Sequence, residues 1–148
     1  MFHFNGQQYL LIVDYFSGFW EVEPLQSTLL SNVIKQIKMH FAQYGIPNVV
    51  VLGNGSQFAA QEFQRFSKTW QFWLITASLR YPKSNGKAEN AIKAAKQLMK
   101  KAKNDKADAY LALLDYINTP TQGLDISPAQ RLMSRRTKTV LPTTVNLL

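Results

Sequence analysis

The stretch Ser84-Asn85-Gly86-Lys87-Ala88-Glu89, with the helix that it opens, decides the fold of this chain. The preceding Tyr81-Pro82-Lys83 is typical of a turn, because proline fixes its own φ angle and disfavours helical backbone at the residue before it. Ser84 or Asn85 can cap the new helix by accepting a hydrogen bond from a backbone N–H. The spacing of apolar residues predicts that the helix continues to about Lys103.

The predicted helix has two different faces. At roughly 100° per residue, one face gathers the apolar residues Ala91, Ile92, Ala95, Leu98, Met99 and Ala102. The other carries an acid in the first turn and then four lysines, namely Glu89, Lys93, Lys96, Lys100 and Lys103. Two interpretations are open. One is a solvated face on which Glu89 pairs with Lys93, and the other is a helix that follows phosphates with a metal-binding acid at its start.

Composition favours one intracellular globular domain with an acidic partner. The chain has 148 residues, 46% hydrophobic and 12% aromatic, with a net charge of +8 that suggests nucleic acid. It has no cysteine, which excludes disulfides and thiolate zinc sites, and only His3 and His40 as histidines. No apolar run approaches the ~20 residues of a bilayer span, and no signal peptide is recognisable. We expect no membrane partner and a location in the nucleus or cytoplasm.

The N-terminal half predicts three antiparallel strands followed by alternating helices and strands. Asn5-Gly6 predicts a hairpin turn before the strand Tyr9–Asp14. A helix capped by Ser27 or Thr28 should end at Gly45, and the apolar run Val49–Leu52 then suits a central parallel strand. Further segments are a helix at 58–70 and a fifth strand at 72–76. We expect the tryptophans of these segments to pack in the core, namely Trp20, Trp70 and Trp73.

The complete pattern predicts an α/β fold with a mixed five-stranded sheet flanked by helices. The element order is β-β-β-α-β-α-β-α-α, and its first strand looks truncated. After the lysine-bearing helix comes a helix at 108–117, packed through Leu111, Leu114 and possibly Tyr110. A last short helix begins at Ser127-Pro128. We expect one domain over residues 1–136 and an extended tail over residues 137–148.

The motifs and their order resemble the ribonuclease-H-like catalytic core of retroviral and LTR-retrotransposon integrases, most of all those of gypsy-type elements. The resemblance covers nearly the whole chain. The matching pieces are Phe4-Asn5-Gly6, Tyr9–Tyr15, Gly45-Ile46-Pro47, Asn54-Gly55 with Gln57-Phe58, Tyr81–Gly86 with Ala88-Glu89, Asn118-Thr119-Pro120, Ser127-Pro128-Ala129, Leu132-Met133 and Arg135-Arg136.

In active family members, two aspartates and a glutamate hold two Mg²⁺ or Mn²⁺ ions for DNA end processing and strand transfer. The glutamate matches Glu89. Counting back the family's spacing of thirty-five intervening residues reaches Gly53, which has no carboxylate. The first aspartate would lie immediately before Met1, and Asp14 is too far along its strand to replace it. We therefore predict a degenerate copy with no cofactor and no catalysis.

The resemblance also implies contact with DNA, because family members use the lysines four and seven residues after the glutamate. These match Lys93 and Lys96, and the full set of expected DNA-binding residues is Asn85, Lys87, Lys93, Lys96 and Lys100. Binding should be weak and salt-dependent, and a homodimer is possible. Arg135 and Arg136 could add a basic patch or form a solvated face. Two alternatives stay open: a fragment of an active Mg-dependent polynucleotidyl transferase, and a module repurposed for protein–protein interaction.

Overall fold

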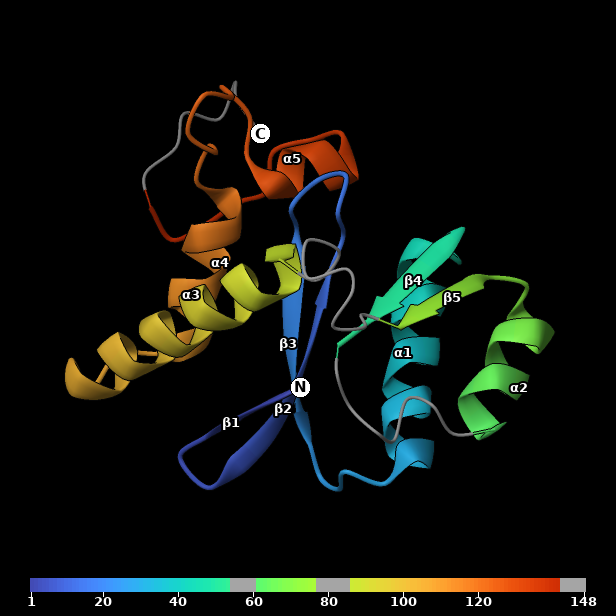
Figure 1. Cartoon of the computed structure of the whole chain (residues 1–148). Coiled ribbons are helices and arrows are strands. Elements are labelled where there is room, and N and C mark those ends of the chain that lie inside the picture. Colours follow the sequence, from blue (N-terminus) through green and yellow to red (C-terminus); the bar gives the residue numbers. More distant parts are fainter. Residues whose placement is uncertain (54–60, 77–85, 142–148) are drawn as a thin grey trace. The chain divides into compact units, whose positions relative to one another are not determined.

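The computed structural model describes residues 1–53, 61–76 and 86–141. Strands and helices follow the predicted order and end with a short fifth helix (Figure 1). None of the helices in these ranges combines the length and apolar character of a bilayer span. The strands are β1 (Phe2–Phe4), β2 (Gln7–Val13), β3 (Trp20–Leu25), β4 (Val49–Leu52) and β5 (Trp73–Thr76). The helices are α1 (Leu30–Tyr44), α2 (Gln61–Trp70), α3 (Gly86–Asn104), α4 (Ala109–Asn118) and α5 (Pro128–Met133).

The hairpin of β1 and β2 confirms the turn predicted at Asn5-Gly6. Asn5 and Gly6 have positive φ angles of 50° and 78°, as a two-residue hairpin turn of this kind requires. Phe2 pairs with Tyr9 across the strands, and their rings stack with centroids 5.3 Å apart. Strand β3 lies on the other side of β2, so the strand order is β1-β2-β3.

The single five-stranded sheet is not confirmed. Over the described ranges, β1, β2 and β3 form one sheet and β4 and β5 form another. β4 and β5 are parallel, with Val49 opposite Trp73 and Leu52 opposite Thr76. The apolar run at 49–52 is therefore a parallel strand, as predicted. Its predicted central position is not confirmed, because the described ranges place it in a two-stranded sheet.

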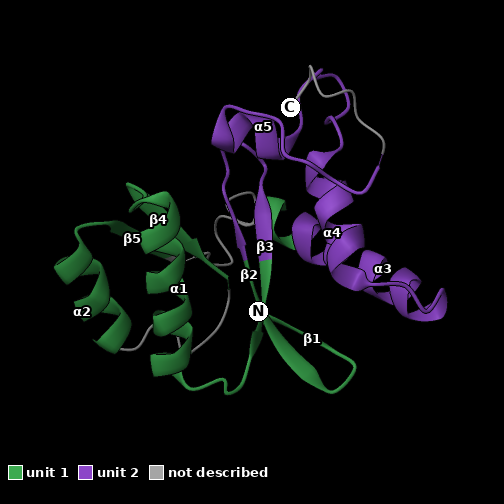
Figure 2. Ribbon diagram, turned by 180° about the vertical axis from the view of Figure 1, so that it is seen from behind, with its two compact units in different colours: residues 1–11, 22–89 green, residues 12–21, 90–148 purple. Residues whose placement is uncertain are grey.

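The chain divides into two compact units (Figure 2). Unit 1 contains residues 1–11 and 22–89, and unit 2 contains residues 12–21 and 90–148. The boundaries fall inside β2, β3 and α3, so each of these elements contributes to both units. The expected division into a domain at 1–136 and a tail at 137–148 stays a prediction, and residues 142–148 of that tail lie outside the described residues.

Aromatic rings form much of the core of unit 1. Helix α1 buries Phe41 together with three aliphatic residues of the same face. The ring of Phe41 lies 6.0 Å from that of Phe66 on α2 and 5.6 Å from that of Phe72. Phe66 also meets Trp70 at 5.5 Å and Phe72 at 5.0 Å. Such edge-on and stacked pairs add to the stabilisation that burial of their area provides.

Two details of unit 1 differ from the sequence predictions. The first residue before α1 is Leu29, which has no side chain able to cap the helix, so capping by Ser27 or Thr28 is wrong. The Ser27 hydroxyl instead accepts a hydrogen bond from the Leu29 N–H at 3.1 Å. Gly45 ends the helix as predicted, at a φ of 96° and with its N–H donating to the Phe41 carbonyl.

The predicted packing of the tryptophans is correct for Trp20 and Trp70 but wrong for Trp73. Trp20 is buried, whereas the Trp73 side chain is 78% exposed. Successive side chains along a strand point to opposite faces. Phe72 takes the direction that packs against the aromatic rings of α1 and α2, and Trp73 therefore points the other way.

Unit 2 is built around α3, whose buried residues match the predicted apolar face. Four small or flexible side chains are buried, namely Ala91, Ala95, Met99 and Ala102. Helix α4 begins after Asp108, whose carboxylate accepts a hydrogen bond from the Tyr110 N–H at 2.8 Å. Packing of α4 through Leu111 and Tyr110 is wrong, because both side chains are exposed, and Leu114 is only half-buried.

Helix α5 starts as its sequence predicts. The Ser127 hydroxyl accepts a hydrogen bond from the Gln130 N–H, and the Gln130 side chain accepts one from the Ser127 N–H. This reciprocal arrangement satisfies two backbone donors at the start of the helix. Pro128 occupies the first turn, where its missing N–H costs nothing.

Candidate nucleic-acid interface and metal-ligand positions

Helix α3 separates its lysines from its buried face. Lys93, Lys96, Lys100 and Lys103 are all exposed, and we refer to these four residues as the lysine face. The ten residue steps from Lys93 to Lys103 correspond to a rise of about 15 Å along the helix. Like charges at this spacing repel one another, so an external polyanion would relieve the repulsion. The lysine face can therefore follow a row of phosphates.

Two further residues predicted to be functional lie at the start of α3. Lys87 and Glu89 lie in the first turn and are exposed. A carboxylate in this position is stabilised by the positive end of the helix dipole. Asn85 and the motif residues 81–84 lie outside the described residues, so their predicted roles rest on the sequence alone.

Gly53 follows directly after β4 and is half-buried. It provides no side-chain oxygen at the position where the sequence resemblance expects the second aspartate. Asn54 and the motif residues Gln57 and Phe58 lie outside the described residues. Of the two matched ligand positions, only Glu89 offers a carboxylate.

Asp14 has a structural role in the turn between β2 and β3. One carboxylate oxygen, Oδ2, accepts hydrogen bonds from the Ser17 N–H at 2.7 Å and from the Ser17 hydroxyl at 2.5 Å. The Gly18 N–H donates to the Asp14 carbonyl at 2.8 Å, and the Ser17 side chain is fully buried. Asp14 therefore holds this turn together.

The donor set at Gly53 and Glu89 does not fit a pair of divalent ions. Mg²⁺ and Mn²⁺ need several oxygen ligands in near-octahedral geometry, and these two positions supply one carboxylate. Across residues 1–53, 61–76 and 86–141, no group of three or more His, Asp or Glu side chains is placed to hold a metal ion. No catalytic step can be derived from these residues.

The sequence prediction missed a contact of Arg131 in unit 2. Its guanidinium donates to the Ser17 carbonyl at 3.2 Å and to the Phe16 carbonyl. It also lies over the Phe16 ring, 5.5 Å from the ring centroid. Since 114 residues separate Arg131 from Ser17, no local periodicity could reveal this pair. The Asp14-x-x-Ser17 spacing, in contrast, is a recognisable turn signal.

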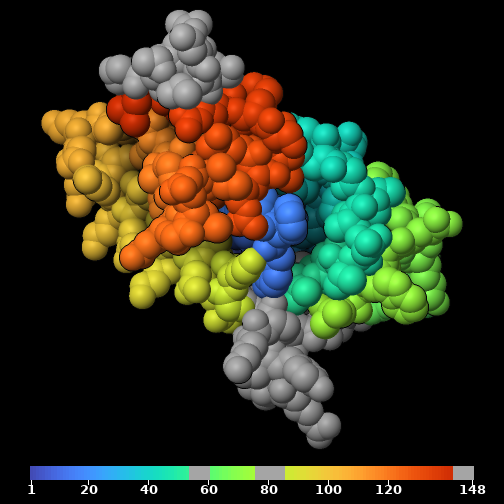
Figure 3. Space-filling view, turned by 90° about the horizontal axis from the view of Figure 1, so that it is seen from above, coloured from blue at the N-terminus to red at the C-terminus, as the bar shows by residue number. Residues whose placement is uncertain are grey.

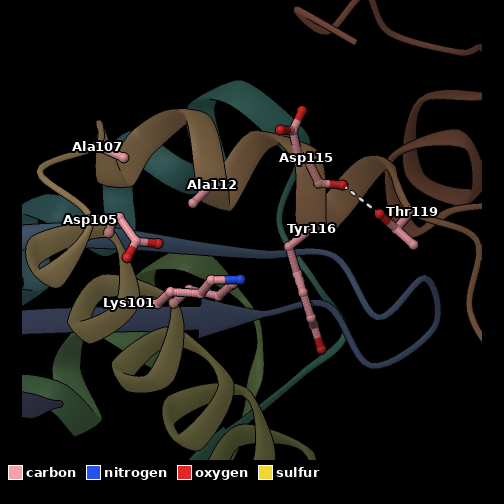
Figure 4. Close-up of a pocket in the computed structure, with 9 residues that line it drawn as sticks. Lys101, Asp105, Ala107, Ala112, Asp115, Tyr116 and Thr119 are labelled. Carbon is pink, nitrogen blue, oxygen red and sulfur yellow. Dashed lines mark hydrogen bonds between the residues drawn. The ribbon is translucent and has the colours of Figure 1, made fainter.

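A pocket of about 330 Å³ lies between α3 and α4 (Figure 4). Lys101 and Asp105 line it from the end of α3, and Tyr116 and Thr119 line it from α4 and its end. The Thr119 hydroxyl donates to the Asp115 carbonyl at 2.7 Å. None of the predicted site residues lines this pocket.

Comparison with known sequences places this chain beside viral Pol proteins. No protein-family model matches the chain. It is 32% identical over 129 residues to the Pol polyprotein of Feline endogenous virus ECE1, covering 81% of this chain and 12% of that protein. It is 31% identical over 129 residues to the Gag-Pol polyprotein of Baboon endogenous virus, covering 81% and 7%. An uncharacterized protein of Caenorhabditis elegans is 27% identical over 142 residues, covering 93% and 11%. The chain thus spans 12% or less of the length of these curated relatives.

Solved structures with the same fold include a retroviral integrase core and a chain of a retroviral intasome. The catalytic core domain of BIV integrase matches with a TM-score of 0.71 at 20% identity, over 90% of each chain. A chain of the simian T-cell lymphotropic virus intasome, solved in complex with PP2A regulatory subunit B56 gamma, matches with a TM-score of 0.73 at 23% identity. That match covers 97% of this chain and 55% of the intasome chain. The chain therefore belongs to the family of retroviral and retrotransposon integrase catalytic cores, as its motifs indicate.

Proposed function

We propose that this chain is a DNA-binding integrase core domain that, as it stands, does not catalyse end processing or strand transfer. The observation that carries the proposal is the exposed lysine face of α3, in which Lys93 and Lys96 stand four and seven residues after Glu89. Lys87 adds a further positive charge in the first turn of the same helix, and the family resemblance assigns Asn85 to the same function. Phosphate contact requires only positive charge within reach, and each contact adds to the salt dependence of binding.

The absence of catalysis is proposed from Gly53. The family's chemistry is Mg-dependent polynucleotidyl transfer, in which metal ions activate the attacking oxygen and stabilise the leaving one. A glycine at the second ligand position leaves Glu89 without the carboxylate that would share a metal with it. This substitution also argues against the alternative of an active transferase fragment, because a longer chain would not change residue 53. We expect no bound Mg²⁺ or Mn²⁺.

We also propose that the two described sheets are parts of one mixed five-stranded sheet. The parallel pair β4–β5 would join the sheet β1-β2-β3 beside β1, the outer strand of that sheet. The integrase structures with matching folds support this arrangement. Residues 1–136 would then act as a single domain.

A second function, self-association, is favoured by the exposed apolar side chains of α4. Tyr110 is 65% exposed and Leu111 is 44% exposed. Part of the surface of α4 is visible in orange in Figure 3. A helix face of this kind is suited to packing against its copy in a two-fold dimer. Sedimentation velocity should show a dimer that the Leu111→Lys variant no longer forms. A monomer at every concentration would remove this part of the proposal.

DNA binding is tested by reversing charge on the lysine face. The Lys93→Glu/Lys96→Glu variant should bind a fluorescein-labelled DNA duplex at least about ten-fold more weakly, because it turns two phosphate contacts into repulsions. The slope of log affinity against log salt should fall by about two for the two lost contacts. Fluorescence anisotropy at several salt concentrations measures both quantities.

The matched control is Lys35→Glu/Lys68→Glu, which reverses two exposed lysines on α1 and α2 and changes the net charge by the same amount. If the control weakens binding as much as the α3 variant does, the chain attracts DNA only through its overall charge. In that case the proposed interface on α3 is wrong.

A further inference from the structure

We propose that Arg135, Arg136 and Lys138 form a second contact with the phosphate backbone of duplex DNA, separate from the lysine face. These three residues, called here the C-terminal basic cluster, are all exposed. They lie within the four positions 135–138, shortly after the end of α5, and no acidic residue stands among them. The inference rests on the proposed DNA-binding function and adds a site to it.

The cluster contrasts with Arg131, four residues before it. Arg131 is half-buried and its guanidinium is used within the protein, by the Phe16 and Ser17 carbonyls and the Phe16 ring. Arg135 and Arg136 make no hydrogen bond, ion pair or ring contact with the other described residues, and the same holds for Lys138. Among the described residues, nothing neutralises these three charges, whereas the guanidinium of Arg131 is engaged within the protein.

The backbone that carries the cluster is held in place at two points. The Ser134 N–H donates to the Gln130 carbonyl at 2.9 Å, and Ser134 adopts a left-handed conformation at the end of α5. Thr137, between Arg136 and Lys138, hydrogen-bonds through its hydroxyl to the Asn118 side chain at the end of α4. Fixing the backbone beforehand lowers the entropy that would be lost when the side chains bind. The sequence alone shows the basic residues, but only the structure shows that their segment is anchored.

The position of the cluster relative to α3 favours a long polyanion as the ligand. Helix α4 starts just after α3 ends, where the Ala107 N–H donates to the Ala102 carbonyl. The cluster is tied to the opposite end of α4 through Asn118. The ten residues of α4 span about 15 Å, and duplex DNA carries one charge per about 1.7 Å of its axis. This separation is within the reach of one duplex, and the planar guanidinium groups suit paired contacts with phosphate oxygens.

The experiment compares three variants of the whole chain with the same labelled duplex. In Arg135→Gln/Arg136→Gln/Lys138→Gln, affinity should fall about five- to thirty-fold at low salt and the salt slope should decrease by two to three. The matched control is Lys35→Gln/Arg65→Gln/Lys68→Gln, which removes three exposed charges from α1 and α2. It should lose less than half as much binding free energy. Circular dichroism melting should be unchanged in both, because all six side chains are exposed.

The outcomes separate this inference from the proposed function. If the cluster variant binds no more weakly than its control while Lys93→Glu/Lys96→Glu still loses binding, the second contact is overturned and the α3 interface stands. If Lys93→Glu/Lys96→Glu also matches its control, the proposed function itself fails. Additive losses in the combined variant support two separate contacts.

Discussion

Unit 1 and unit 2 have the same excess of basic side chains, and the lysine face lies in unit 2. Unit 1 has seven Lys and Arg against three Asp and Glu, and unit 2 has ten against six. In unit 2 the lysine face occupies a single helix. Unit 1 instead contains the two matched metal-ligand positions, Gly53 and Glu89. The two units therefore have the same net charge. What distinguishes unit 2 is the row of four lysines on one helix.

Under the function that we propose, metal chemistry and DNA contact are separable properties of this family. Metal-dependent chemistry needs particular carboxylates at fixed positions, and our proposal assigns one of these positions to Gly53, which has no carboxylate. Phosphate contact needs only charge within reach and tolerates changes along the helix. A chain of this family can thus keep a DNA-binding surface after its metal chemistry has gone.

The largest effect that we expect comes from the aromatic core of unit 1. Phe66→Ala removes a ring that meets Phe63, Trp70 and Phe72 at centroid distances of 5.0 to 5.6 Å. The resulting cavity should lower the free energy of unfolding by about 3–5 kcal/mol. Below the melting temperature, DNA affinity should be unchanged, since the lysine face lies in unit 2. Denaturant titration and anisotropy measure the two quantities.

The matched control for that variant is Trp73→Ala. Because the Trp73 side chain is 78% exposed, its loss should change the unfolding free energy by less than about 0.5 kcal/mol. A loss comparable to that of Phe66→Ala would mean that Trp73 is part of a packed core in solution. The contrast between the units would then need revision.

The smallest effect concerns Glu89, the acid at the head of the lysine face. Glu89→Gln removes a carboxylate from the first turn of α3 and should destabilise the protein by about 0.3–1 kcal/mol through the helix dipole. DNA affinity should stay constant or rise slightly, because a negative charge beside the lysines is gone. Thermal melting and anisotropy on the same sample check both expectations. A large fall in affinity would instead give Glu89 a direct role at the interface.

Much of the fold follows from local sequence patterns. The two positive φ angles at Asn5-Gly6, the end of α1 at Gly45 and the buried alanines of α3 are all set by residues close together in the chain. Turn chemistry and helical periodicity act at this range. The lysine face was predictable for the same reason, since four positions of one helix define it.

The features that the sequence did not predict depend on distant partners or on which face is covered. Arg131 contacts a turn more than a hundred residues away, and local patterns carry no record of that pairing. The large side chains of Trp73 and Tyr110 made both residues candidates for the core. Both side chains are exposed, because no other described element covers the face of β5 or of α4 on which they lie. The absence of a carboxylate at Gly53, in contrast, was visible only through the family spacing.

The most direct test of the central claim measures binding and cleavage on one labelled duplex that carries a retroelement end. In Mn²⁺, the chain should bind this duplex in a salt-dependent way, while nicking stays at the level of the Glu89→Ala variant. Specific nicking above that variant would contradict the account, because it would show that the residues beside Glu89 still hold a working metal centre.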